Sequence, residues 1–319
     1  MKILAVMEFP PAKTPQSHRK ALRAAGVDYR IAAQTTYMTA EVDWLLELDY
    51  TEGLEEFAQE ADILQFHPAI GQPWASVDLE PRVLDADELP FGPITRWPEG
   101  KPRVYYFHGS KNAEANVRFY AEHYGSKGPV WTSTLDYAEL MGATYAPTTL
   151  DYSDLPRAAL RGDRDPLIVT HAPTNPPNCH TAEFLDIARR AGCVYQFLYR
   201  VPNAEVLAAK ARSNAGFDHL RGCFSVNSLE NAGMGLAPLV GLPERRAREL
   251  ERLLGGRSPF YPIETVEDLA GAIRRLTADP GLTRELQERA YTWTREVMDP
   301  ARLARRMVGM YEEVLQGQR

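Results

Sequence analysis

The sequence predicts an α/β protein made of two Rossmann-like, doubly wound domains that face a central cleft. Short apolar runs alternate with segments of helical periodicity along the chain, which is typical of mainly parallel sheets covered by helices. This alternation restarts after residues 150–166, a stretch rich in charge, proline and turn formers that indicates a linker. A length of 319 residues fits two domains of ordinary size.

The first domain is expected at residues 1–155. Its apolar runs predict strands at 2–9, 27–34, 61–67 and 103–110, with shorter strands at 128–134 and 143–149. Helical periodicity predicts helices at 17–26 and 51–60, the first of which is closed by Gly26. We also expect the last helix of the chain, about 298–319, to pack back on this domain.

The second domain is expected at residues 156–297. The pattern predicts strands at 167–171, 193–201 and 237–242, and helices at 181–192 and 203–214. Further helices are expected at 265–279, 282–297 and 300–315. In open parallel sheets, ligands bind beyond the carboxyl ends of the strands, so the default site is the cleft that these ends would face.

Composition argues against several classes of partner and compartment. The formal net charge of −7 gives no overall attraction for nucleic acid or an anionic membrane, although nucleic acid stays open as a reaction partner. The three cysteines show no CxxC spacing and are expected to be free in a reducing compartment. The first apolar run stops at Glu8, and no window is long enough to span a membrane, so we expect a cytoplasmic protein.

Three apolar strands end in a histidine, at His67, His108 and His171. Carboxyl ends of parallel strands line the ligand crevice, so three histidines in this position point to function more strongly than any one of them alone. For each residue the alternative is a hydrogen-bonded structural histidine. His108 is the best candidate because the glycine after it permits close approach of the backbone.

A metal site is not expected. Cys179 and His180 are adjacent, and adjacent side chains diverge, so they are poor joint ligands. The DxD tripeptides at 85–87 and 163–165 could hold a divalent cation, but their charged, proline-flanked surroundings favour solvated turns. We therefore expect neither a metal nor another bound cofactor.

The segment FSVNSLENAGMGLAPLV at 224–240 gives the strongest local signal. Ser225, Asn227 and Ser228 are suitable N-cap residues for a short helix that carries Glu230 and ends at two glycines before a buried strand. The N-terminus of such a helix favours phosphate, and Glu230 could accept hydrogen bonds from sugar hydroxyls. The alternative is an ordinary turn between strand and helix.

Motifs of other enzyme classes are absent from the sequence. The first strand is not followed by GxGxxG, and the chain contains neither a P-loop nor GxSxG. A dinucleotide-dependent dehydrogenase, a P-loop kinase and a serine hydrolase with a nucleophile elbow are therefore not supported.

The second half resembles the donor-binding domain of GT-B glycosyltransferases, in particular the retaining, family-4-like branch that uses nucleotide sugars. The matching pieces are the strand with HAPTN, the V-P-N turn, AKARSNAGFDHLRG, NSLENAGMGLAPLV and the last helices, which together cover most of residues 165–319. The first half is similar in layout, with ADILQFH and VYYFHGS where the family places histidines of the cleft.

The resemblance implies a glycosyltransferase that moves a sugar from a nucleotide-activated donor to an unidentified acceptor, with retention and without a metal. It implies catalytic roles for His108 and Glu230, Glu230 also contacting the ribose. The donor-binding residues are then His171, Thr174, Asn175, Arg200, Ser225, Val226, Asn227, Ser228 and Glu230, and the acceptor side holds His67 and Lys111.

The chain departs from the family pattern in three places. An arginine and a lysine that usually clamp the diphosphate are replaced by Pro176 and Cys179, and a glutamate eight positions before Glu230 is replaced by Gly222. The glycine-rich loop after the first strand is also missing. Arg200, Lys210 and Arg221 are candidates for compensating cations. The alternatives are a catalytically degenerate binding or regulatory protein, and a GT-B fold that runs other sugar chemistry, such as epimerisation.

Overall fold

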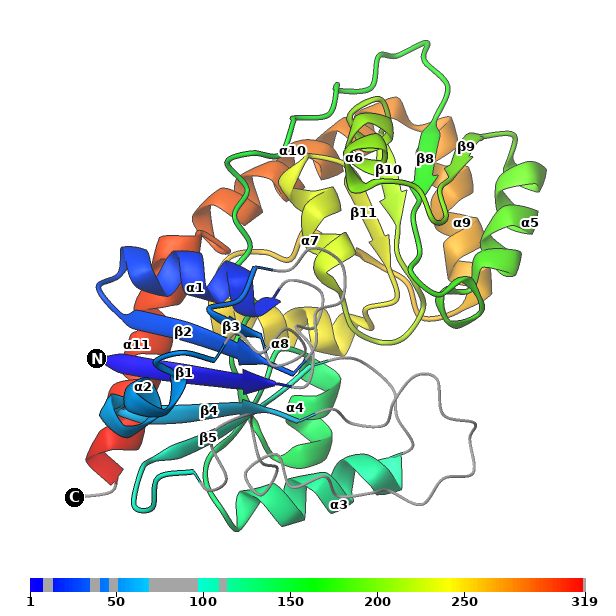
Figure 1. Ribbon diagram of the computed structural model, residues 1–319. Coiled ribbons are helices and arrows are strands. Elements are labelled where there is room, and N and C mark those ends of the chain that lie inside the picture. The colour runs from blue at the N-terminus through cyan, green and yellow to red at the C-terminus, as the bar shows by residue number, and fades with distance from the viewer. Residues whose placement is uncertain (8–13, 35–40, 46–50, 69–96, 109–113, 318–319) are drawn as a thin grey trace. The chain divides into compact units, whose positions relative to one another are not determined.

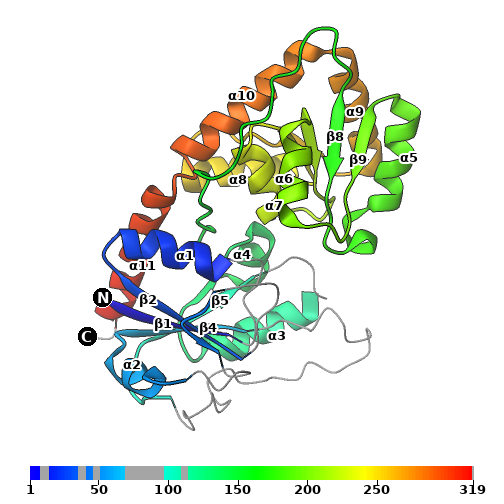
Figure 2. The same cartoon turned by 45° about the horizontal axis from the view of Figure 1, so that its top comes forward.

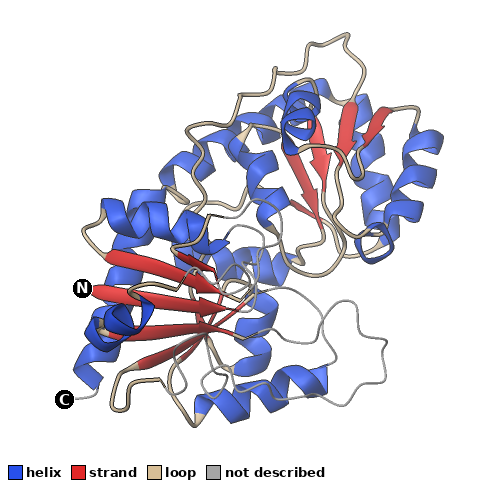
Figure 3. Cartoon of the chain, viewed as in Figure 1, coloured by secondary structure: helices blue, strands red, loops and turns tan. Residues whose placement is uncertain are grey.

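The computed structural model describes residues 1–7, 14–34, 41–45, 51–68, 97–108 and 114–317. The chain divides into two compact units, and each is described by itself below. Met1–Leu150 and Pro300–Arg319 form the first unit, and Asp151–Asp299 form the second. In both units the strands are enclosed by helices (Figure 3). No helix in the described part is long and apolar enough to cross a membrane.

The first unit contains a parallel sheet in the order β3-β2-β1-β4-β5-β6-β7. The chain runs from β1 outward through β2 and β3, then crosses to the other side of β1 for β4, so the topological switch point lies between β1 and β4. The strands are β1 (Lys2–Met7), β2 (Asp28–Ala33), β3 (Trp44–Leu45), β4 (Ile63–His67), β5 (Arg103–Phe107), β6 (Val130–Thr132) and β7 (Thr144–Tyr145).

Helices cover both faces of this sheet, as the alternation of side chains in β1 requires. Ile3 and Ala5 pack under α1 (Thr14–Ala24) and α11 (Pro300–Gly317), which lie side by side (Figures 1 and 2). Leu4 and Val6 belong to the opposite core, with α2 (Leu54–Glu60), α3 (Glu114–Gly125) and α4 (Leu135–Met141). Because both faces are buried, the strands are nearly continuous apolar runs.

The second unit contains a smaller parallel sheet in the order β12-β11-β10-β8-β9, with its switch point between β8 and β10. Its strands are β8 (Ile168–His171), β9 (Val194–Phe197), β10 (Ala215–Phe217), β11 (Ala237–Val240) and β12 (Tyr261–Pro262). Its helices are η3 (Pro176–Cys179, a 3₁₀ turn), α5 (Thr181–Ala191), α6 (Asn203–Ala211), α7 (Val226–Gly233), α8 (Glu244–Leu254), α9 (Val266–Ala278) and α10 (Pro280–Glu296).

Helix ends in the second unit follow directly from the sequence. Thr265 caps α9 by accepting a hydrogen bond from the backbone N–H of Asp268. Asp279 caps α10 in the same way, and Pro280 occupies the first helical position, where a missing N–H costs nothing. Gly192 ends α5 with a φ of 67° in the left-handed region.

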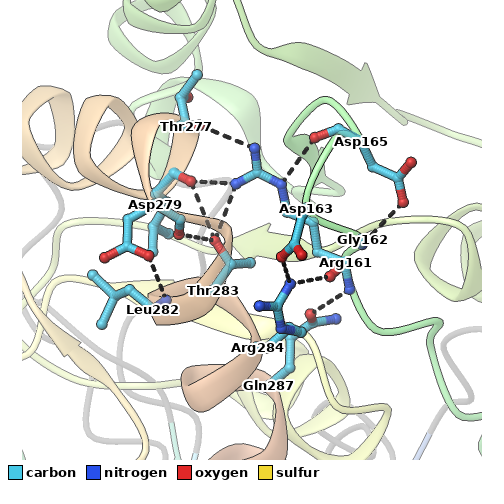
Figure 4. A network of polar contacts seen from close by, with 11 residues as sticks. Arg161, Gly162, Asp163, Asp165, Thr277, Asp279, Leu282, Thr283, Arg284 and Gln287 are labelled. Atoms are coloured by element: carbon cyan, nitrogen blue, oxygen red, sulfur yellow. Dashed lines mark hydrogen bonds and ion pairs between the residues drawn. The ribbon is translucent and has the colours of Figure 1, made fainter.

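The stretch 150–166, expected as a linker, is packed onto the second unit. Arg161 is buried, and its guanidinium donates to the backbone oxygens of Leu276 and Thr277 in the last turn of α9 (Figure 4). It also donates to Thr283 Oγ1 at 3.2 Å. One arginine therefore satisfies carbonyls that the helix end leaves without partners, and it fixes this stretch to the corner between α9 and α10.

Several predicted strands are shorter in the structure, and for two of them the reason is clear. The strand expected at 143–149 is β7, Thr144–Tyr145, because Pro147 follows and cannot donate to a ladder. The strand expected at 193–201 ends at Phe197, and Arg200 has a φ of 57°, which is incompatible with an extended strand.

Candidate functional site

The carboxyl ends beside the switch point of the second sheet carry the candidate donor site. His171 ends β8, and Asp218 directly follows β10. The turn after β10 leads into α7, whose N-terminus lies on the same side of the sheet. Sequence analysis selected His171 and the start of α7 but missed Asp218, whose position directly after a buried strand was the available signal.

Asp218 organises the start of α7. Its buried carboxylate accepts hydrogen bonds from Ser225 Oγ at 2.6 Å, from Ser228 Oγ, and from Asn227 Nδ2 at 3.2 Å. Ser225 is also the N-cap, accepting from the backbone N–H of Asn227 at 3.0 Å. These three side chains lie together as predicted, but both serine hydroxyls donate to a carboxylate of the protein.

The charge on Asp218 is maintained despite its burial. Burial by itself raises the pKa of this carboxyl, but nearby His219 and the hydrogen bonds from Ser225, Ser228 and Asn227 outweigh it and lower the pKa. The backbone N–H of Val226 has no acceptor among the described residues and is the open donor at this helix start.

Glu230 lies one turn into α7 and forms an ion pair with Lys210 of α6. Lys210 Nζ donates to Glu230 Oε2 at 2.8 Å and to Asn227 Oδ1 at 2.7 Å. The lysine side chain is 1% exposed and the glutamate side chain 21% exposed. Glu230 Oε1 has no hydrogen bond within the described part of the chain, so it can accept one from a ligand hydroxyl.

His171 is fully buried, and the protein uses both of its ring nitrogens. Nδ1 lies 3.1 Å from the carbonyl oxygen of Phe217 and must donate to it, so Nε2 accepts from Thr181 Oγ1 at 2.8 Å. Burial lowers its pKa from 6.5 to about 4. In this structure His171 ties β8 to β10 and α5.

The loop after His171 contains Thr174 and Asn175, which the resemblance assigns to the donor. Thr174 is exposed and Asn175 half-buried, just before the 3₁₀ turn η3. Cys179 at the end of this turn is buried, and burial raises the pKa of its thiol to about 11. His180 adopts a left-handed φ of 54°, and its Nδ1 accepts from the backbone N–H of Leu220 at 3.3 Å.

Arg200 stands apart from these contacts. It follows the carboxyl end of β9, is exposed, and lies with its guanidinium carbon 5.1 Å from the ring centre of Tyr199. Phe197 and Tyr199 are also exposed, at 39% and 38%, and their rings are stacked. The edge of the sheet beside β8 thus presents aromatic surface and a cation.

The first unit holds a histidine cluster at the carboxyl ends of β4 and β5. His67 Nδ1 lies 2.7 Å from His108 Nε2, and the rings are parallel with centres 5.0 Å apart. His67 Nε2 lies 2.7 Å from Gln65 Nε2, and His108 Nδ1 lies 3.3 Å from Ser133 Oγ. The structure therefore brings together the two histidines that sequence analysis placed at strand ends of this domain.

These histidines are neutral at physiological pH. Burial lowers the pKa of His67 and of His108 well below the ordinary value, and other nearby histidines lower both further. His18 of α1 belongs to the same layer, its ring 5.3 Å from that of Tyr106, and burial lowers its pKa to about 3. A neutral imidazole acts as a directed hydrogen-bond partner rather than as a cation.

Lys111, expected on the acceptor side, and the tripeptide at 85–87 lie outside the described residues. The tripeptide at 163–165 is a turn in which Asp163 pairs with Arg284 at 2.6 Å, and Asp165 accepts from the backbone N–H of Gly162 (Figure 4). Within the described ranges, no group of three or more His, Cys, Asp or Glu could hold a metal ion.

Comparison with known proteins connects this geometry to one fold. No family model matches the chain, and no curated protein matches its sequence. Several solved structures do match over almost the full length of both chains. Anabaena HepE in complex with UDP and glucose has a TM-score of 0.66 at 12% identity and covers 98% of this chain and 100% of its own.

Two other structures give the same result. Sucrose-phosphate synthase from Thermosynechococcus elongatus has a TM-score of 0.60 at 10% identity, with 99% of this chain and 100% of that chain covered. A glycosyltransferase from Rickettsia africae has a TM-score of 0.62 at 12% identity, with 98% of each chain covered. The predicted fold class, two doubly wound α/β domains of the GT-B type, is confirmed.

Proposed function

We propose that the protein is a glycosyltransferase that uses a nucleotide-activated sugar, with UDP-sugars as the first donors to test. The observation that carries this proposal is the similarity in fold, over nearly the whole chain, to HepE, which was crystallised with UDP-glucose. Fold alone does not define a reaction, so the proposal also depends on the groups at the carboxyl ends of the strands.

In this proposal the second unit binds the donor. Glu230 Oε1 accepts from the ribose hydroxyls while Lys210 holds the other carboxylate oxygen in place. The N–H of Val226 donates to the diphosphate at the positive end of α7. Lys210 neutralises Glu230, and Arg200 and Arg221 are the cations proposed to act on the diphosphate. Thr174 and Asn175 add neutral hydrogen bonds.

The first unit supplies His108, which we propose acts as a hydrogen-bond donor to the transferred sugar, and His67, which holds it. Departure of a nucleoside diphosphate develops negative charge, and donors already aimed at that charge lower the barrier. Retention and independence of a metal are part of the proposal. Activity should therefore survive EDTA, and the anomeric configuration of the product, read by proton NMR, should match that of the donor.

We also propose a compartment and a class of acceptor. The three cysteines are free and buried, which supports the reducing cytoplasm. The acceptor carries a hydroxyl or another nucleophile, and its class is to be found by screening.

A second candidate is a binding protein that has lost transfer activity. The observation that favours it is the commitment of both serine hydroxyls at the start of α7 to the Asp218 carboxylate. Together with Pro176 and Cys179 in place of cations, this leaves few donors for a diphosphate. Such a protein would bind a nucleotide sugar without cleaving it.

Calorimetric titration with UDP, ADP, GDP and CMP, followed by UDP-glucose hydrolysis, separates these functions. A glycosyltransferase binds one nucleotide and releases it from the donor; Glu230→Gln weakens that binding roughly tenfold, one neutral hydrogen bond replacing a charged one. Glu285→Gln, on the exposed face of α10, is the matched control and should bind like the wild type. Binding without hydrolysis or transfer to any screened acceptor identifies the binding protein. Failure to bind any nucleotide rejects both.

A further inference from the structure

Gln65 is a polar residue in the middle of a buried strand. It lies on the face of β4 that α1 and α11 cover, and its side chain is fully buried. Its amide Nε2 donates to Tyr29 Oη at 3.0 Å, and its Oε1 accepts from Tyr311 Oη. Tyr311 comes from α11, 246 residues later in the chain. The amide nitrogen therefore faces Tyr29 and the amide oxygen faces Tyr311.

The orientation of this amide determines where the neighbouring protons lie. The second N–H of Gln65 Nε2 points to His67 Nε2 at 2.7 Å, and an amide N–H can only donate. His67 Nε2 must therefore accept, and a neutral His67 carries its proton on Nδ1. That proton is donated to His108 Nε2 at 2.7 Å, so neutral His108 in turn carries its proton on Nδ1.

We propose that Gln65 is a positioning residue that holds His67 and His108 in the Nδ1–H tautomer, so that His108 presents an N–H at the end of this series of hydrogen bonds. Its use in catalysis rests on the proposed function, in which this N–H donates to an oxygen of the transferred sugar. The direction of the hydrogen bonds from Gln65 through His67 to His108 depends on the first unit alone, and below it is called their polarity.

The contact between His108 and Ser133 is the last of these hydrogen bonds, and it is the one that a ligand can replace. His108 Nδ1 lies 3.3 Å from Ser133 Oγ, a longer separation than the two 2.7 Å contacts behind it, and His108 is only partly buried. A ring or bridging oxygen of a sugar can only accept. If these hydrogen bonds ran in the opposite direction, His108 Nδ1 would present a lone pair and would repel such an oxygen.

The opposite direction of these hydrogen bonds can be imposed at Gln65, which makes the inference testable. In Gln65→Glu a carboxylate can only accept, so His67 must carry its proton on Nε2, and His108 must do the same. Tyr311→Phe removes the donor to Gln65 Oε1 but leaves both acceptors of Nε2, Tyr29 Oη and His67 Nε2. Rotating the amide in this variant would turn both N–H groups toward the phenylalanine ring, which accepts no hydrogen bond, so the tautomers should stay as in the wild type.

The test is long-range ¹H–¹⁵N NMR of protein labelled in its seven histidines, with His67→Gln and His108→Gln used for assignment. Both histidines should show the Nδ1–H pattern in the wild type and in Tyr311→Phe, and the Nε2–H pattern in Gln65→Glu. Tyr145→Phe is the control, since this buried hydroxyl has no hydrogen-bond partner among the described residues, and it should match the wild type. An Nε2–H pattern in the wild type overturns the proposal, and so does an unchanged pattern in folded Gln65→Glu.

Hydrolysis of UDP-glucose measures the consequence for activity. Gln65→Glu should lower kcat about tenfold and leave KM nearly unchanged, because a donor used in the transition state is lost while the donor site of the second unit is intact. Tyr311→Phe, in which the tautomers are unchanged, and Tyr145→Phe should retain wild-type activity. If no nucleotide binds but the tautomers are as stated, the proposed function fails and the polarity stands. If the protein hydrolyses the donor but its histidines carry the opposite tautomers, the polarity fails and the proposed function stands.

Discussion

Replacing Lys210 by methionine tests the electrostatic basis of the candidate donor site. The Lys210 side chain is 1% exposed, and its ammonium group lies 2.8 Å from Glu230 Oε2 and 2.7 Å from Asn227 Oδ1. Methionine keeps most of the length and the apolar stem of the side chain but removes the charge and the donors. Both acceptors then lose their shared partner.

The expected cost follows from the geometry. At an effective dielectric constant of about 20, charges 2.8 Å apart attract by about 6 kcal/mol, but the cost of burying the ammonium group offsets most of this energy. Removing only the lysine leaves Glu230 as an unpaired charge, which typically costs about 3–5 kcal/mol. The glutamate is 21% exposed and is partly hydrated, so we expect the lower end, about 3 kcal/mol.

A double-mutant cycle separates the ion pair from general packing. Glu230→Gln should also cost about 3 kcal/mol, because the amide oxygen can still accept from the lysine but leaves its buried ammonium group without an anion. In Lys210→Met with Glu230→Gln no unpaired charge remains, so the double variant should be at least about 1.5 kcal/mol more stable than the sum of the single effects indicates.

Hydrogen-exchange mass spectrometry across a urea titration gives the midpoint for peptides of α7 and β10, and so reports the second unit separately. Additive effects within about 0.5 kcal/mol would refute the reasoning, because the pair would then contribute no coupling energy.

The same measurement tests two more features of the second unit. Because the pKa of His171 is lowered from 6.5 to about 4, its neutral form stabilises the fold fully above pH ~6.5, and about 3 kcal/mol is lost as the pH falls toward 4. His171→Gln should remove that slope; an unchanged pH profile would contradict it. Gly216→Ala should destabilise by about 1–3 kcal/mol, since a Cβ would lie 2.4 Å from the Asn231 side chain. The control Gly271→Ala, in open space on α9, should stabilise by about 0.5–1 kcal/mol, and equal effects of the two changes would count against this packing argument.

Residues at strand ends could be predicted from the sequence because their position is a local property. An apolar run that stops at a histidine places that histidine at the carboxyl end of a strand. His67, His108 and His171 all lie at or directly after such an end. What the sequence could not give is their state. His171 differs from His108 in having Phe217 and Thr181 as partners, and those partners are brought to it by other elements.

The residues that sequence analysis missed depend on contacts between distant segments. Tyr311 is one of many residues on an amphipathic helix until α11 is placed against β4. Lys210 was named as a candidate cation for the diphosphate, but its pairing with Glu230 could not be predicted. Gln65 and Asp218 did carry a signal, since each is a polar residue within or directly beside a buried strand. Such residues need hydrogen-bond partners inside the protein, so they mark places where a buried polar network forms.

The departures from the family pattern can be compared by the charged groups that they leave at the start of α7. Pro176 and Cys179 remove two expected cations, Glu230 and Lys210 neutralise each other, and Asp218 remains as an anion bound to both serine hydroxyls. Among these side chains one negative charge remains, that of Asp218, while Arg246 of α8 brings a cation close to the helix start by donating to the carbonyl oxygen of Gly222. For this helix start to accept a diphosphate, the attraction has to come from the Val226 N–H, the helix dipole and a cation from outside α7, because the local side chains are already paired with one another. This is the reason that nucleotide binding, and not catalytic rate, is the property on which the proposed function depends first.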